Sequence, residues 1–186
     1  MKKNNIIKAA TYFFATQGFD GTTTKAISEE ANVTEPLLYY HYSGKDEIYT
    51  TILDSAFNDY SKHLKDLKKD TKTAFEKIEN LFTLHFDLAK KMPNEMALVV
   101  SPKPSKLNDP NHIYAKHNKQ HNKWLKSYIT RCLNKGIASG EFKQMAVKET
   151  TGLIMMVINA IFQKKIYQDS RAMRKTIMEF WHKALS

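Results

Sequence analysis

The chain has 186 residues, of which 42% are hydrophobic and only 6 are glycine and 5 proline. This composition excludes disordered, collagenous and low-complexity chains, and the length suffices for one or two domains with a buried core. The 29 basic against 19 acidic side chains give a net charge of +10, which is compatible with DNA, an acidic membrane surface or an anionic ligand as partner. Residues 1–50 hold more acidic than basic side chains, so the positive excess lies in the rest of the chain.

The only cysteine, Cys132, excludes an internal disulfide and a cysteine-based metal site. The longest apolar run covers residues 153–158 and is far shorter than the roughly 18 residues that a membrane-spanning helix needs. The first residues lack the cleavage site of a signal peptide. We therefore expect a cytoplasmic protein without a membrane segment.

The spacing of apolar residues is helical along the whole chain, and it predicts an all-α fold of about nine helices. The first helix is expected over residues 5–17, and Gly18 supplies the left-handed residue that ends it. A hydroxyl among residues 22–24 can cap a second helix, which closes near Ala31. Asn32 tolerates the left-handed turn that follows.

Thr34 can cap a short third helix that ends at residues 40–42, with Pro36 in its first turn, where a missing N–H costs little. A fourth helix is expected over about 45–68. Two short helices joined by a tight turn, behind a longer supporting helix, are the arrangement of a helix-turn-helix. The same spacing places four apolar side chains in one core, namely Phe14, Ile27, Leu38 and Tyr42.

Residues 5–50 agree in type and spacing with a known N-terminal signature, without gaps. The agreeing positions include Ile7, Ala9, Ala10, Phe14, Gly18, Phe19, Thr22, Thr23, Ile27, Ala31, Val33, Thr34, the run 38–42 and the run 45–48. The chain thereby resembles the TetR (tetracycline-repressor) family of bacterial transcriptional regulators. The resemblance implies an N-terminal helix-turn-helix DNA-binding domain over residues 1–47 and a C-terminal helical effector-binding and dimerisation domain over residues 48–186.

The resemblance also implies which residues contact double-stranded DNA. Thr24, Tyr39 and Lys45 occupy the positions at which the family holds phosphates, which a hydroxyl, a phenol and an ammonium group can each do by donating a hydrogen bond. Base reading is expected from the exposed face of the third helix. The remaining members of the predicted DNA-contacting set are Lys25, Thr34, Glu35, Leu37, Tyr40 and His41.

Two of these side chains suggest particular base contacts. Leu37 can touch a thymine methyl group, and Glu35 can accept a hydrogen bond from a cytosine amine. The alternatives are that Leu37 packs locally and that Glu35 only fills a first helical turn, where an acidic residue is favoured anyway. Thr24 can likewise be a simple helix cap and Tyr39 a packing residue. Because Pro36 replaces the small residue that the family often has, operator preference stays open.

Five further helix-length segments follow, at about 71–91, 94–100, 111–139, 147–167 and 170–184. The fourth of these is apolar nearly all round, and the fifth is also markedly apolar. Two such helices at the end of a small chain predict a symmetric homodimer interface over about 147–185. A helix that is buried on all sides within one chain is the alternative.

The segment from residue 111 places aromatic and imidazole side chains on one face and lysines on the opposite face. Such a face can line an apolar pocket for a small-molecule effector, although stripes of this kind more often belong to a core. The predicted pocket residues are Phe82, Phe86, Met96, His117, His121, Trp124, Tyr128, Met155 and Asn159. The two histidines at i, i+4 lack the further ligands of a zinc site, so neither a metal nor a cofactor is expected.

These features favour a homodimeric, ligand-responsive repressor that binds a palindromic operator through residues 24–43. The alternative is a helical small-molecule- or lipid-binding module with weak or lost DNA affinity. An enzyme is not expected, because the sequence has no glycine-rich phosphate loop, no nucleophile with a recognisable base and no carboxylate pair at a useful spacing.

Overall fold

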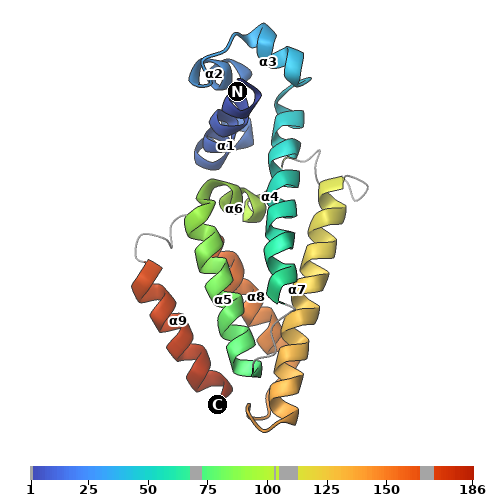
Figure 1. The fold of residues 1–186 in the computed structure, drawn as a ribbon, viewed down its shortest axis with the longest axis vertical. Coiled ribbons are helices and arrows are strands. Elements are labelled where there is room, and N and C mark those ends of the chain that lie inside the picture. The colour runs from blue at the N-terminus through green and yellow to red at the C-terminus, as the bar shows by residue number, and fades with distance from the viewer. Residues whose placement is uncertain (1, 68–72, 103, 105–112, 164–169) are drawn as a thin grey trace. The chain divides into compact units, whose positions relative to one another are not determined.

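The structure is a computed structural model, which describes residues 2–67, 73–102, 104, 113–163 and 170–186. These ranges hold nine α-helices and no strand, as the all-α prediction requires (Figure 1). The helices are α1 (Lys2–Gly21), α2 (Thr24–Glu30), α3 (Glu35–His41), α4 (Lys45–Leu67), α5 (Ala74–Lys91), α6 (Pro93–Val100), α7 (Ile113–Ala138), α8 (Val147–Phe162) and α9 (Ser170–Leu185). The chain divides into two compact units, Met1–Asp59 with Asn94–His117 and Tyr60–Pro93 with Asn118–Ser186.

In the first unit, α1, α2 and α3 pack on one another and on the beginning of α4. Their apolar faces form one core whose buried members include Ile6, Ala10, Phe14, Ile27, Leu38, Tyr42, Ile48, Tyr49 and Leu53. The predicted grouping of Phe14, Ile27, Leu38 and Tyr42 is therefore confirmed. Burial of this core holds the two short helices in place, since helices of seven residues are too short to be stable on their own.

Local turn chemistry sets the limits of these helices. Gly18 has a φ of 78° inside α1, and Phe19 turns back so that its ring stacks on Phe14 at 5.6 Å. The hydroxyl of Thr23 caps α2, and the hydroxyl of Thr34 caps α3. Asn32 makes the turn between them with a φ of 52°. The predicted caps at Thr23 and Thr34 and the left-handed turn at Asn32 are confirmed, whereas α1 begins three residues earlier than expected, at Lys2, and continues past Gly18 to Gly21 across a kink.

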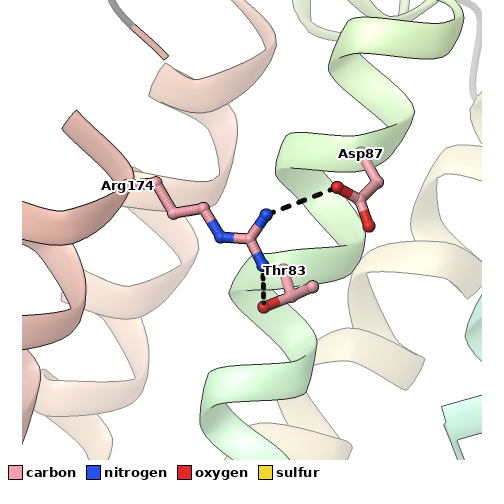
Figure 2. A network of polar contacts seen from close by, with 3 residues as sticks. All are labelled: Thr83, Asp87 and Arg174. Carbon is pink, nitrogen blue, oxygen red and sulfur yellow. Dashed lines mark hydrogen bonds and ion pairs between the residues drawn. The ribbon is translucent and has the colours of Figure 1, made fainter. Parts of the chain in front are cut away.

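In the second unit, α5 packs against both α8 and α9. Figure 2 shows how a polar contact joins two of these helices: Arg174 of α9 donates a hydrogen bond to the hydroxyl of Thr83 at 3.0 Å and lies 3.5 Å from the carboxylate of Asp87, both on α5. At the start of α5, the carboxylate of Glu141 accepts hydrogen bonds from two free backbone N–H groups, those of Ala74 and Phe75. A side chain that follows α7 thus caps a helix more than sixty residues earlier.

Helix α8 is shorter than the expected 147–167. Gln163 has an extended backbone, with φ −80° and ψ 122°, and its N–H bonds to the carbonyl of Ala160, so the helix ends at Phe162. The apolar run of α8 ends with Phe162, and the next three residues of the sequence are polar. The predicted helix limits at 68, 71, 111 and 164–167 lie outside the described residues.

Apolar side chains remain exposed on the last two helices. On α8, Ile154 and Ile158 are buried, while Leu153 is 55% and Met156 is 67% exposed. On α9, Trp181 is buried but Phe180 is 61% exposed. One chain therefore covers only part of the apolar surface of these helices.

Candidate functional site

The contact between α2 and α3 is built on three polar side chains. The hydroxyl of Thr24, the first residue of α2, lies 3.1 Å from a carboxylate oxygen of Glu35 and 3.1 Å from the phenol oxygen of Tyr39. Glu35 and Tyr39 stand one helical turn apart on α3 and so face the same side. Thr24 and Glu35 are half-buried, whereas Tyr39 is 52% exposed. The structure thus brings three residues of the predicted DNA-contacting set together.

The outer face of α3 is accessible while its inner face is anchored. Leu38 is fully buried in the core, and the neighbouring Tyr40 is 82% exposed with its ring against that of His41. Thr34 is exposed, and its hydroxyl accepts a hydrogen bond from the N–H of Leu37. Leu37 and His41 are half-buried and Lys25 is exposed. A helix fixed from one side in this way can present its other side to a duplex groove.

Lys45 holds the start of α4 to the end of α1. Its ammonium group donates hydrogen bonds to the carbonyl oxygens of Phe19 at 2.9 Å and Thr22 at 3.1 Å. The same nitrogen lies 4.4 Å from the centre of the Phe19 ring, a cation–π contact. An ammonium group has three N–H donors, so one stays available for a further acceptor.

A second polar site is buried in the other unit. The phenol of Tyr60 on α4 forms a short hydrogen bond with Nε2 of His85 on α5, whose Nδ1 bonds to the carbonyl of Leu81 at 2.6 Å. Because a carbonyl only accepts, Nδ1 carries the proton and Nε2 accepts from Tyr60. The ring of His121 on α7 lies 4.1 Å from that of Tyr60, and Phe162 of α8 closes the cluster at 5.5 Å.

Burial controls the protonation of this cluster. It lowers the pKa of His85 to about 4, an effect that the bond to the Leu81 carbonyl opposes and the nearby His121 reinforces. Burial also lowers the pKa of His121 to about 4 and raises the pKa of Tyr60 far above its usual value. Both imidazoles are therefore neutral at pH 7.

The predicted pocket residues are spread over the structure. In the second unit, the buried Phe82 stacks on Trp181 at 5.9 Å, and Tyr128 stacks on the half-buried Trp124 at 5.2 Å. Phe86 and His121 are buried, Met155 is half-buried and Asn159 is exposed. Met96 is buried and belongs to the first unit, and the side chain of His117 lies outside the described residues.

Comparisons with known proteins decide the family. Residues 6–52 match the sequence profile of the bacterial regulatory proteins, tetR family. Over 128 residues the chain is 30% identical to the biofilm operon icaADBC HTH-type negative transcriptional regulator IcaR of Staphylococcus epidermidis, an alignment that covers 68% of this chain and 69% of that protein. The chain belongs to the TetR family. It is a helix-turn-helix transcriptional regulator that binds DNA, as the sequence resemblance implies.

Solved structures agree with the TetR fold. The ketosteroid transcriptional regulator KstR2 of Mycobacterium tuberculosis matches with a TM-score of 0.87 at 16% identity, over 100% of this chain and 95% of that chain. The transcriptional regulator FadR from Bacillus subtilis, solved in complex with stearoyl-CoA, matches with a TM-score of 0.66 at 20% identity, over 99% and 100% of the two chains. These likenesses extend the fold beyond the helix-turn-helix to the whole chain.

Within the described ranges, no helix combines the length and apolar character needed to cross a bilayer. Among the same residues, no three histidine, cysteine or acidic side chains gather where a metal ion could be held.

Two members of the buried polar cluster, Tyr60 and His85, are not among the residues predicted from the sequence. A signal for His85 was present in the sequence, because it lies at helical spacing from Leu81 and Phe82 and next to Phe86. An imidazole on such an apolar face of a helix is expected to be buried, as it is in α5. Nothing in the sequence indicated the partner, because Tyr60 lies 25 residues earlier on another helix.

Proposed function

We propose that the chain is a homodimeric, ligand-responsive repressor that binds a palindromic operator. Each protomer places α3 in the major groove of one half-site, and residues 24–43 make the DNA contacts. The observation that carries the proposal is the arrangement of α3, in which Leu38 is locked in the core while Tyr39 and Tyr40 stay exposed. The relative from Staphylococcus epidermidis is a negative regulator, which supports repression.

We propose that α8 and α9 form the dimer interface. Leu153, Met156 and Phe180 are large apolar side chains that one chain leaves more than half exposed. Pairing these helices with those of a second copy removes the side chains from water in a symmetric, self-complementary contact.

The effector site we propose includes the buried cluster of Tyr60, His85 and His121, together with the other predicted pocket residues of the second unit, namely Phe82, Phe86, Trp124, Tyr128, Met155 and Asn159. Apolar walls with a few polar groups are the usual lining of a small-molecule site. The excess of positive charge beyond residue 50 favours an anionic effector. Because FadR from Bacillus subtilis was solved with stearoyl-CoA, long-chain acyl-CoA thioesters are the first compounds to test.

We propose that α4 couples effector and DNA. This helix carries Lys45, which bonds to the end of α1, and Tyr60, which bonds to His85. A ligand that rearranges the cluster around Tyr60 would shift α4 and change the spacing of the two recognition helices, through a coupling of about 1 to 3 kcal/mol. Since its partner is chromosomal DNA, we place the regulator in the cytoplasm and assign it no catalytic role.

The test starts from a duplex selected out of a random pool by the purified protein. We expect the selected sequence to be palindromic, to bind two chains, and to bind far more tightly than a scrambled duplex of the same length. Titration with stearoyl-CoA should weaken this complex. Selection that enriches no sequence, while the protein remains folded and binds stearoyl-CoA, would support the alternative of a ligand-binding module without DNA recognition.

A further inference from the structure

At the DNA-binding face, the hydroxyl of Thr24 already donates its one hydrogen bond to another side chain of the protein. A threonine hydroxyl has one proton to donate, and an ionised carboxylate only accepts. At 3.1 Å from Glu35, the Thr24 hydroxyl therefore donates to the carboxylate. The contact with Tyr39, also 3.1 Å long, then has the phenol as donor and Thr24 as acceptor. The three residues form a directed chain from Tyr39 through Thr24 to Glu35.

In this series of hydrogen bonds, neither the Thr24 nor the Tyr39 hydroxyl has a proton left to donate to DNA. A phosphate oxygen can only accept hydrogen bonds, so Thr24 and Tyr39 must each give up an intramolecular partner before they can hold a phosphate. For Thr24 that partner is a carboxylate, which is the strong kind of acceptor because it is charged. Glu35 and a phosphate thus offer the same chemistry to the same donor.

The surroundings favour the carboxylate in the free protein. Glu35 and Thr24 are half-buried, so water and salt screen their hydrogen bond less than they would screen a fully exposed one. The first 50 residues, which include α1, α2 and α3, hold five lysines against six acidic residues, so this part of the chain carries no positive excess. One of those lysines, Lys45, already gives two of its three protons to backbone carbonyls.

We propose that Glu35 competes with DNA phosphate for the Thr24 proton and thereby lowers the affinity for duplex DNA of any sequence. On binding, the Thr24 hydroxyl exchanges the carboxylate for a phosphate oxygen, and Glu35 loses its partner next to the DNA backbone. The carboxylate thus limits non-specific binding and leaves selectivity to the other residues of α3. The inference rests on the proposed contact of α2 and α3 with DNA.

The test compares full-length wild type with Glu35→Ala and Glu35→Gln, using the selected duplex and a scrambled duplex at several salt concentrations. We expect Glu35→Ala to tighten binding to both duplexes by a similar factor, roughly tenfold, the size of one charge-assisted hydrogen bond. Glu35→Gln keeps an acceptor but loses the charge and should give a smaller gain. Glu29→Ala removes an equal charge from an exposed position on α2 and should change affinity less than about twofold.

The contribution of the Thr24 hydroxyl is measured in a Thr24→Val background, where the hydroxyl is absent and the side-chain shape is kept. There the gain from Glu35→Ala should shrink to that of Glu29→Ala. An undiminished gain in this background would mean that Glu35 acts through its charge alone and would overturn the competition. Weaker binding of Glu35→Ala to the selected duplex only would instead identify Glu35 as a reader of bases.

The two proposals fail in different ways. If selection enriches no operator, the repressor proposal fails, yet the scrambled duplex still tests the competition. If Glu35→Ala binds no duplex more tightly than wild type, with the circular dichroism and unfolding midpoint of a folded protein, the competition is wrong whatever the operator.

Discussion

The ammonium nitrogen of Lys45 lies 2.9 Å from the carbonyl oxygen of Phe19 and 4.4 Å from the centre of its ring. One side chain at the start of α4 thus binds both the backbone and the side chain of the residue that follows Gly18. Together with the bond to the Thr22 carbonyl, this contact ties the start of α4 to the last turn of α1, where the Phe19 carbonyl also accepts the N–H of Thr22 at 3.3 Å. Lys45 is therefore a structural contact in the free protein as well as a predicted phosphate contact.

Replacing Lys45 should cost stability as well as DNA affinity. Lys45→Met keeps the aliphatic stem but removes two charge-assisted hydrogen bonds and the cation–π contact, so we expect the free energy of unfolding to fall by about 1 to 3 kcal/mol. Chemical denaturation measures this loss. Lys25→Met is the matched control at an exposed position and should leave stability within about 0.5 kcal/mol. Equal stability of the two variants would show that the Phe19 contact contributes nothing.

Glu141 should contribute more stability than a surface ion pair. Its carboxylate accepts from the N–H groups of Ala74 and Phe75 at 2.9 and 2.7 Å, at the positively polarised start of α5. Glu141→Ala should cost about 1 to 2 kcal/mol, the usual value of a lost cap. Asp87→Ala, which breaks the exposed pair with Arg174, should cost less than about 1 kcal/mol. Chemical denaturation of both variants makes the comparison. If Glu141→Ala does not lower the free energy of unfolding more than Asp87→Ala does, Glu141 does not act as a cap.

Gly136 allows the turn after α7 to pack tightly. A Cβ at this position would overlap the ring of Phe142, which is buried. Gly136→Ala should therefore lower the unfolding free energy by about 1 to 3 kcal/mol, despite the better helix propensity of alanine. Gly21→Ala meets only Gln17 Cβ at 3.5 Å, an ordinary contact, and should be close to neutral. Thermal unfolding of both variants makes the comparison, and an unchanged midpoint for Gly136→Ala would contradict the packing.

Stability should fall with acidification between pH 6.5 and pH 4. His85 and His121 have pKa values of about 4 in the folded chain against 6.5 for an ordinary histidine. The unfolded chain therefore binds more protons in this window, and each histidine lowers stability by up to about 1.4 kcal/mol per pH unit. Above pH 6.5 their contribution is fully present. Urea unfolding at several pH values measures the slope.

Two variants assign this slope to the buried cluster. His121→Phe removes one titrating group and should make the slope shallower. Tyr60→Phe keeps both histidines but removes the bond to His85, so stability should fall at every pH while the window stays in place. A slope that does not change in His121→Phe would show that this imidazole is not the group that titrates.

Charges on the exposed apolar positions of α8 should separate the proposed dimer. Leu153→Glu with Met156→Glu places two carboxylates where one chain leaves the side chains 55% and 67% exposed, so folding of the single chain should tolerate them. Buried in a dimer interface they should weaken association by roughly a hundredfold or more. Light scattering and sedimentation measure the mass. Lys126→Glu, exposed on α7, should leave it unchanged, and a double variant that stays dimeric would place the interface elsewhere.

How far the sequence predicts the structure depends on the range of the interactions involved. Asn32 and Thr34 set a turn and a cap by contacts within four residues, and these predictions were correct, whereas Gly18 kinks α1 instead of ending it. Helix α8 was expected to continue to residue 167, but it ends at Phe162, where the backbone of Gln163 is extended; the polar residues that follow do not by themselves forbid a helix, so the sequence does not mark this end.

The sequence by itself determined the all-α fold and the helix-turn-helix, since both depend on spacing and on local turn chemistry, and its resemblance to known regulators implied the family. It also located the net charge, which lies outside the first 50 residues. Only the tertiary structure decided the partners of individual polar groups. Thr24 bonds to Glu35 and Tyr39, Lys45 to Phe19, and Tyr60 to His85, over separations of 11 to 26 residues. Such pairs form where packed helices bring donors and acceptors together, and periodicity along one helix contains no information about them.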